Sequence, residues 1–328
     1  MKAYVTAELS PAGVRRLEAL GYTVERGGWG TTRRVQDREA YLEAAAGATL
    51  LVSEIETVDA SVLSALPSVR LVATARGGPV NVELGACAAR GIPVVFTPGR
   101  NAVSVAEFTL GVLLCLVRQI GLAERHLRGH GWCVGEELPY LHFRGPELGR
   151  RTLGVVGLGA VGGLVAQRAR DGFGMQVLHT DPVVPGGVDL PELLERSDVL
   201  TLHCPRLPET RGLIGAAELD LLGRQGYLVN TAGGGIVDEP ALVEALHAGH
   251  LAGAALDVFA TEPLPEGSPL LSAPNLLITP HLAGAALDVV EHHSALICDD
   301  VERWHRGEPL RHAAAQPETH PSRPSATS

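Results

Sequence analysis

A glycine-rich turn at residues 157–162 could bind a phosphate-bearing ligand. It joins a strand-like apolar run to a helix-like run, and the expected contacts to the ligand are Gly157, Gly159, Ala160, Val161 and Gly162. The first glycine allows a tight bend, the second lets backbone N–H groups approach a pyrophosphate, and the third lets the helix lie close to the strand. Such turns also join strands to helices for purely structural reasons, so the hexad alone leaves both interpretations open.

Asp181 strengthens the nucleotide interpretation. It ends the next apolar stretch, Met175–Thr180, nineteen residues after Gly162. At that place a carboxylate can accept hydrogen bonds from an adenosine ribose. No Arg or Lys lies between Asp181 and Pro191 to bind a 2′-phosphate. The sequence therefore predicts NAD as the cofactor rather than NADP.

Four apolar runs in the second half of the chain end in polar residues. These residues are His203, Asn230 with Thr231, Asp257 and His281. A buried parallel strand has no use for such groups in its interior, whereas ligands bind at its carboxyl end. The repeated pattern predicts a site along one edge of a parallel sheet.

His281 and Glu262 could form a proton-transfer pair. Considered alone, His281 could be a structural histidine, and Glu262 could be an acidic residue in a surface loop. Together they predict an imidazole held by a carboxylate, which suits a proton donor or acceptor near neutral pH. The pairs His247/His250 and His292/His293 lack carboxylate or cysteine partners in the sequence and are expected to be solvated. We predict no metal site.

Composition limits the possible partners. The chain has 328 residues, enough for two domains, and a formal net charge of −10, which argues against nucleic acid. No apolar run reaches membrane-spanning length, and the N-terminus begins as a strand, so neither a membrane span nor a signal peptide is expected. Five scattered cysteines favour reduced thiols and a cytoplasmic location. Lys2 is the only lysine, which nearly excludes Schiff-base chemistry.

Strand-like and helix-like segments alternate through the first 100 residues, as in a parallel α/β layer. After the strand-like run Arg70–Thr74 comes an irregular loop with Arg76, Gly77 and Gly78. This loop is either a Gly-Pro turn with a surface arginine or a holder for an anionic substrate. Arg100 lies in the linker that follows.

Three further segments have open roles. The pattern of Ser104–Val117 predicts a long apolar helix. Residues 120–150 are less regular and unusually long for a connection. This segment therefore forms an interface, covers the site or is a surface excursion. Residues 286–305 read as a helix that could return to the first domain. The tail from about residue 313 is rich in Ala, Pro, Ser and Thr and is expected to be disordered.

These motifs resemble the D-isomer-specific 2-hydroxyacid dehydrogenase family, which includes phosphoglycerate dehydrogenases. The resemblance runs from about residue 45 to 310 and rests on five segments: Gly157–Gly162, His203-Cys204-Pro205, Gly234–Glu239, Ala255–Phe259 and Pro280-His281. It implies an α/β fold with two Rossmann-like or flavodoxin-like parallel-sheet domains. The substrate domain would be discontinuous, residues 1–99 plus 288–328, and residues 100–287 would bind NAD. A homodimer built on residues 104–150 is also implied.

The resemblance assigns roles to individual residues. It makes His281 the acid/base and Glu262 its partner, in hydride transfer between NAD and a 2-hydroxy or 2-oxo acid. Asp257 and the Asn230–Ala232 backbone would position the nicotinamide amide. Further cofactor contacts are expected from His203, Cys204, Pro205, Thr210, Thr231, Ala232, Gly233, His281 and Gly284. The expected substrate contacts are Arg76, Gly77, Gly78 and Arg100.

One position departs from the family pattern. Gly233 stands where the family carries the arginine that grips the substrate carboxylate. Loss of a donor aimed at developing oxyanion charge typically costs about 10²- to 10³-fold in rate. Two hypotheses follow. Either the enzyme acts on a different acidic substrate, for instance one with a phosphate or phosphonate, or the chain is a catalytically impaired NAD(H)-binding regulatory or sensor protein.

Overall fold

The computed structural model describes residues 1–315 and divides them into two compact units. One unit combines Met1–Asn101 with the segment from Ala286 onward, and the other is Ala102–Ala285. The boundaries expected from the sequence, 99 and 288, lie close to these. Most of the predicted disordered tail, residues 316–328, lies outside the described part of the chain.

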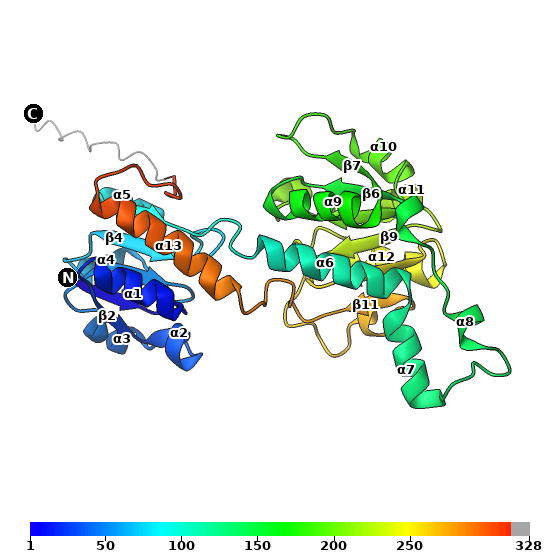
Figure 1. The fold of residues 1–328 in the computed structure, drawn as a ribbon, viewed down its shortest axis with the longest axis horizontal. Helices are drawn as coiled ribbons and strands as arrows, with labels where there is room; N and C mark the ends of the chain where they lie inside the picture. The colour runs from blue at the N-terminus through cyan, green and yellow to red at the C-terminus, as the bar shows by residue number, and fades with distance from the viewer. Residues whose placement is uncertain (316–328) are drawn as a thin grey trace, which may run out of the picture. The chain divides into compact units, whose positions relative to one another are not determined.

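The first unit contains, within the described residues, a five-stranded parallel sheet in the order β2-β1-β3-β4-β5 (Figure 1). Its elements are β1 (Lys2–Val5), α1 (Pro11–Ala19), β2 (Thr23–Arg26), α2 (Gly28–Thr32), α3 (Arg38–Ala44), β3 (Ala48–Ser53), α4 (Ala60–Ala65), β4 (Leu71–Thr74), α5 (Leu84–Ala89), β5 (Val94–Val95) and α13 (Val289–His305). Alternate residues of β3 point to opposite faces. Leu50 packs with α1 and α13, whereas Leu51 packs with α3, α4 and α5.

Helix α13 returns to the first unit, as its sequence suggested. It packs against α1, where Arg16 pairs with Asp299 and Glu302 at 2.7 and 2.8 Å. The Ser294 hydroxyl accepts a hydrogen bond from the Ser10 N–H at 2.9 Å, next to the start of α1. These contacts join the two ends of the chain into one unit.

The sequence patterns missed two short elements in this unit. Strand β2 is a mostly exposed edge strand of polar residues, so it shows no apolar alternation. Helix α2 contains two glycines and is held from outside, because the buried Glu56 accepts a hydrogen bond from the Trp29 N–H at 2.8 Å.

The prediction that the disordered tail starts at about residue 313 is wrong. Ala313 forms an antiparallel bridge with Val95, and Ala314 is buried in the core. Small apolar side chains fit against the short edge strand β5, so order extends past residue 313.

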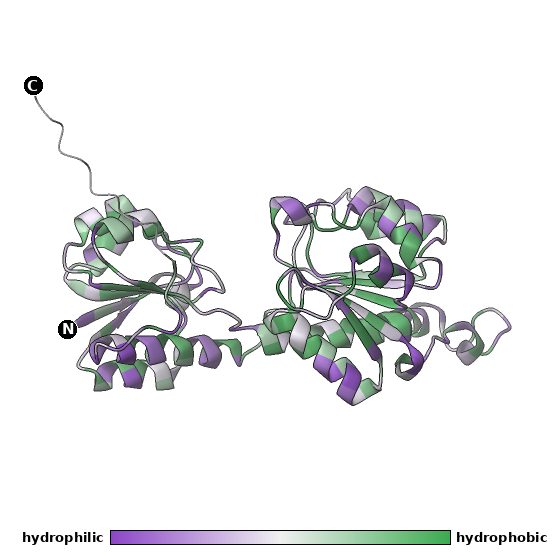
Figure 2. Cartoon of the chain, turned by 90° about the horizontal axis from the view of Figure 1, so that it is seen from above, coloured by the Kyte–Doolittle hydropathy of each residue, from purple (hydrophilic) through white to green (hydrophobic). Residues whose placement is uncertain are grey.

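The second unit contains, in the described chain, a six-stranded parallel sheet in the order β11-β10-β9-β8-β6-β7. Its elements are α6 (Ala102–Val117), α7 (Ile120–His130), α8 (Pro139–His142), β6 (Thr152–Val156), α9 (Ala160–Phe173), β7 (Gln176–Thr180), α10 (Leu190–Glu195), β8 (Val199–Leu202), α11 (Ala216–Leu222), β9 (Tyr227–Asn230), α12 (Glu239–His247), β10 (Gly253–Leu256) and β11 (Leu276–Ile278). Helices α6 and α9 cover one face, and α10, α11 and α12 cover the other. Figure 2 shows that the strands are mostly hydrophobic, whereas the helices around them carry both hydrophilic and hydrophobic residues. Together the two sheets confirm the predicted fold class.

The segment 120–150 is more regular than predicted. It contains the eleven-residue helix α7 and the short helix α8, neither with a buried residue. Among residues 1–315 no single helix is long and apolar enough to cross a membrane. Helices α6 and α7, which meet at a bend of 57°, would together be long and apolar enough, by length and composition only.

Candidate active site

The glycine turn follows β6 and is shaped to admit a pyrophosphate. A Cβ atom on Gly162 would lie 2.0 Å from the Gly157 carbonyl oxygen, so only glycine allows α9 to start this close to the strand. A Cβ on Gly159 would meet nothing within 4 Å, and no side chain caps the start of α9. The exposed N–H groups of this helix end therefore suit the phosphates of a dinucleotide.

Asp181 lies at the carboxyl end of β7 and organises the adjoining loops. Its carboxylate accepts hydrogen bonds from the N–H groups of Leu158, Val183 and Val184, at 2.7 to 2.9 Å. These bonds lower the pKa of Asp181, which is therefore ionised at neutral pH. The depression at residues 181–188 is lined by neither Arg nor Lys, so it offers no partner for a 2′-phosphate.

His203 follows β8, next to the glycine turn. Its Nε2 lies 2.9 Å from the Thr201 hydroxyl, and its buried Nδ1 has no partner among the described residues. Burial lowers the pKa of His203 to about 4. The ring is therefore neutral under ordinary conditions and supports the loop through packing.

The neutral state of His203 makes a prediction about stability. Because the folded pKa is about 4 and the ordinary value is 6.5, protons bind the unfolded state first as the pH falls. The free energy of unfolding should therefore fall by up to about 3 kcal/mol between pH 6.5 and 4 through this residue. Urea unfolding followed by circular dichroism should show a shallower pH dependence in His203→Gln than in the wild type. The exposed His247→Gln is the control, and an unchanged slope in His203→Gln would contradict the assignment.

The other cofactor contacts expected after β8 and β9 lie in tightly bonded loops. The Thr210 hydroxyl donates to the Pro205 carbonyl at 2.7 Å and accepts from the Leu207 N–H at 2.9 Å. Cys204 is half-buried beside them. The buried Thr231 bonds to Thr109 of α6 at 2.8 Å. These contacts fix the loops at the carboxyl edge of the sheet.

Asp257 holds the segment that carries His281. Its buried carboxylate accepts hydrogen bonds from the Thr279 hydroxyl and from the N–H groups of Leu282 and Ala283, at 2.6 to 2.8 Å. The expected contact Gly284 follows directly. His281 itself has φ of 55°, an uncommon conformation for a residue other than glycine. The role that the structure shows for Asp257 is thus to position the His281 loop.

His281 and Glu262 are in contact, as the sequence predicted. The His281 Nδ1 lies 2.8 Å from Glu262 Oε2, and Glu262 Oε1 accepts from the Phe259 N–H at 2.9 Å. Partial burial raises the pKa of Glu262, but its hydrogen bonds and the charges of His281 and Arg206 bring it below the ordinary value. Glu262 is therefore a carboxylate, which accepts the Nδ1 proton and leaves Nε2 free for a substrate.

Both residues line an open depression of about 560 Å³. Its walls are the loops after β8, β9 and β10 together with His281: Arg206, Ala232, Gly233, Gly234, Val258, Phe259, Ala260, Thr261, Glu262 and His281. The Asn230 side chain fixes the Gly233 loop, accepting from the Ala232 N–H at 3.0 Å and donating to the Gly233 carbonyl at 3.1 Å. Sequence reasoning missed Arg206, because nothing in the sequence places it beside Gly233.

The substrate residues expected in the first unit follow β4 and β5. Gly77 and Gly78 lie in the loop after β4, and the guanidinium of Arg76 donates to the Glu54 carbonyl at 3.3 Å. Arg100 pairs with the Glu54 carboxylate at 3.1 Å and contacts the His293 Nδ1 at 3.0 Å. The charge of Arg100 is therefore already balanced within its own unit.

His293 is a further correction. It was expected to be solvated, but it is 1% exposed, and its Nε2 lies close to the Glu8 carbonyl. Burial lowers its pKa, and the neighbouring Arg100 lowers it as well. The side of helix α13 that carries His293 packs against the loops of the first unit. The sequence pattern of the helix does not predict this packing. No group of three or more potential metal ligands occurs in the described range 1–315.

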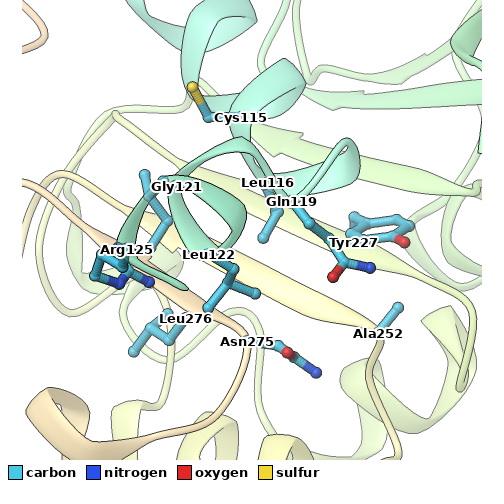
Figure 3. Close-up of a pocket in the computed structure, with 11 residues that line it drawn as sticks. Cys115, Leu116, Gln119, Gly121, Leu122, Arg125, Tyr227, Ala252, Asn275 and Leu276 are labelled. Carbon is cyan, nitrogen blue, oxygen red and sulfur yellow. The ribbon is translucent and has the colours of Figure 1, made fainter. Parts of the chain in front are cut away.

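A smaller cavity of about 70 Å³ lies at the opposite ends of the strands (Figure 3). Its side chains come from the bend between α6 and α7 and from the amino ends of β9, β10 and β11, including Tyr227, Ala252 and Asn275. Because the glycine turn, Asp257 and His281 all follow carboxyl ends, this cavity has no part in the candidate site.

Comparison with known proteins finds relatives over most of this chain. A D-3-phosphoglycerate dehydrogenase of Mycobacterium tuberculosis is 42% identical over 254 residues, 74% of this chain but 47% of that protein. The chain thus spans about half the length of this phosphoglycerate dehydrogenase. A glyoxylate reductase of Korarchaeum cryptofilum is 33% identical over 94% of this chain and 93% of its own length.

A solved structure shows the same fold. The TT0316 protein of Thermus thermophilus has a TM-score of 0.80 and 35% identity, and the match covers 96% of this chain and all of that one. The sequence profile of the D-isomer-specific 2-hydroxyacid dehydrogenase NAD-binding domain matches residues 110–283. The chain therefore belongs to the D-isomer-specific 2-hydroxyacid dehydrogenase family, and residues 110–283 are its NAD-binding domain.

Proposed function

We propose that this chain is an NAD-dependent oxidoreductase that transfers a hydride between nicotinamide and a 2-hydroxy or 2-oxo acid. The observation that carries the proposal is the 2.8 Å contact between His281 and Glu262 in the depression beside the Gly233 loop. A protein that only sensed NAD(H) would have no need of this proton-transfer pair. Arg76, Gly77 and Gly78 are proposed as further substrate contacts from the first unit.

The chemistry divides between cofactor and protein. NAD would be held by the glycine turn and Asp181, and when bound it would supply the hydride acceptor or donor. His281 then exchanges a proton with the oxygen on C2 of the substrate through Nε2. Glu262 holds the Nδ1 proton and stabilises the imidazolium that forms when the hydroxyl is oxidised.

Turnover against a panel of 2-oxo and 2-hydroxy acids with NAD(H), including phosphate- and phosphonate-bearing members, tests this proposal. We expect at least one member to be reduced or oxidised. A protein that binds NADH but turns over none of the panel would instead be the regulatory protein that the glycine at position 233 also allows.

Cofactor preference gives a second expected result. NADH should bind at least about 10²-fold more tightly than NADPH, because Asp181 accepts ribose hydroxyl bonds and repels a 2′-phosphate. Asp181→Asn keeps the side chain's size but removes its charge, so it should narrow this ratio. Calorimetric titration of both variants with both cofactors measures it, and equal binding of NADH and NADPH by the wild type would contradict the assignment.

We also propose that the protein is a cytoplasmic homodimer formed through residues 104–150. Several large apolar side chains are exposed there, namely Ile120, Leu122, Leu127, Trp132, Leu138, Tyr140 and Leu141. In Figure 1, α7 and α8 project from the second unit. Such concentrated apolar exposure is typical of an interface.

Sedimentation equilibrium tests the dimer with a matched pair of variants. Leu127 in α7 and Leu271 outside the segment are both 53% exposed. Leu127→Asp should give a monomer, because it places a charge in the interface, whereas Leu271→Asp should remain a dimer. A monomeric wild type, or two variants that behave alike, would contradict the proposal.

A further inference from the structure

The space next to Gly233 is already occupied by the stem of another arginine. A Cβ atom built on Gly233 would lie 3.3 Å from the Cβ of Arg206, and its next neighbour would be Ile236 at 3.5 Å. Arg206 and Gly233 line the same depression as His281 and Glu262. A side chain on residue 233 and the side chain of Arg206 would therefore start from nearly the same place and extend into the same space.

Arg206 is available to bind a ligand. Its side chain is exposed and makes no hydrogen bond or ion pair within the described part of the chain, residues 1–315. By contrast, Arg76 donates to a carbonyl oxygen and Arg100 is paired with Glu54. Arg206 is the one of these three arginines that lies in the depression with the proton-transfer pair, where its positive charge acts on the Glu262 carboxylate.

The backbone that carries Arg206 is held firmly while its side chain is free. The Thr210 hydroxyl bridges Pro205 and Leu207, the residues on either side of Arg206. The Asn230 side chain fixes the facing Gly233 loop. Strands β8 and β9 are neighbours in the sheet, which brings the two loops together. The base of the Arg206 side chain is therefore fixed beside the Gly233 loop, while its guanidinium is free to meet an anion.

We propose that Arg206 binds the carboxylate of the substrate in place of the side chain that residue 233 lacks. A guanidinium offers two parallel N–H donors to a carboxylate, a geometry that an ammonium group cannot reproduce. Glycine at residue 233 then leaves room for the Arg206 stem and avoids two like charges at one place. This inference rests on the proposed oxidoreductase function, but its binding test does not require turnover.

Oxalate in the presence of saturating NADH serves as the probe, since it presents carboxylates without being reduced. Calorimetry on the full chain should show that Arg206→Ala weakens oxalate binding about 10- to 10²-fold, with Arg206→Lys in between. The exposed Arg211→Gln, farther along the same loop and outside the depression, should bind oxalate as the wild type does. NADH affinity should change less than about twofold in every variant, since Arg206 lines the depression with His281 and the glycine turn does not.

A second measurement separates charge recognition from general damage. For any 2-oxo acid that is turned over, kcat/KM for the acid and for its neutral amide should be compared in the wild type and Arg206→Ala. The preference for the acid should fall about 10-fold or more in the variant.

The outcomes distinguish the two proposals. If the wild type binds oxalate through Arg206 yet turns over nothing, the oxidoreductase function fails and the anion site stands. If turnover persists but Arg206→Ala binds oxalate as tightly as the wild type, the role of Arg206 is wrong. Absence of any oxalate binding by the NADH-bound wild type would also overturn it.

Discussion

His281→Ala is expected to lower kcat about 10²- to 10⁴-fold while leaving the NADH dissociation constant within about twofold of the wild type. In the proposed mechanism the imidazole handles the substrate proton, whereas the glycine turn and Asp181, on other loops, are proposed to hold the cofactor. Stopped-flow or steady-state kinetics with the best panel substrate, together with NADH titration, measure both quantities. The exposed His247→Ala on α12 is the control and should retain full activity. Wild-type rates in His281→Ala would remove this residue from the mechanism.

Glu262→Gln tests the same pair by a subtler change. Gln keeps the size of the side chain, but its neutral amide stabilises an imidazolium less than a carboxylate does. The pH–rate profile for reduction should therefore move to lower pH, because the protonated ring is needed to donate. If the profile keeps its position, the 2.8 Å contact is structural and does not tune proton transfer.

Gly233→Arg is expected to lower kcat/KM on the protein's own substrate by about 10²-fold. The new Cβ would press on Arg206 at 3.3 Å, and two guanidinium groups would compete for one anion. Gly233→Ala adds only that Cβ, so it should cost much less and separates the effect of space from that of charge. The backbone itself permits either change, because residue 233 does not have a positive φ.

The double variant Gly233→Arg/Arg206→Ala sharpens this prediction. It moves the guanidinium from the loop after β8 to the loop after β9 and removes the competition. Activity should recover in part relative to Gly233→Arg alone, most clearly on ordinary 2-oxo acids. The opposite result, a wild type inert on every compound and a gain of activity in Gly233→Arg alone, would show that the glycine records lost activity rather than adaptation.

The sequence was sufficient for features that depend on neighbours along the chain. Gly157 indicates a tight turn, and Gly162 indicates a helix packed close to the preceding strand. Asp181 follows a strand at the spacing expected of a residue that contacts the ribose. Polar residues at the ends of apolar runs marked the carboxyl edge of the sheet, where β8, β9 and β10 indeed deliver His203, Asn230 and Asp257. Buried strands and turns have local chemical requirements, so they leave local patterns.

The tertiary structure alone decided how separate loops meet. That Asp257 holds the His281 loop, and that His293 is buried rather than solvated, depends on which elements pack together. The same is true of Arg206 beside Gly233, since β8 and β9 pair only in the folded sheet. An exposed arginine on a loop has the same local pattern whether it faces water or a substrate. Its place in the site is set by strand order, and strand order arises from the packing of the whole unit rather than from any one segment.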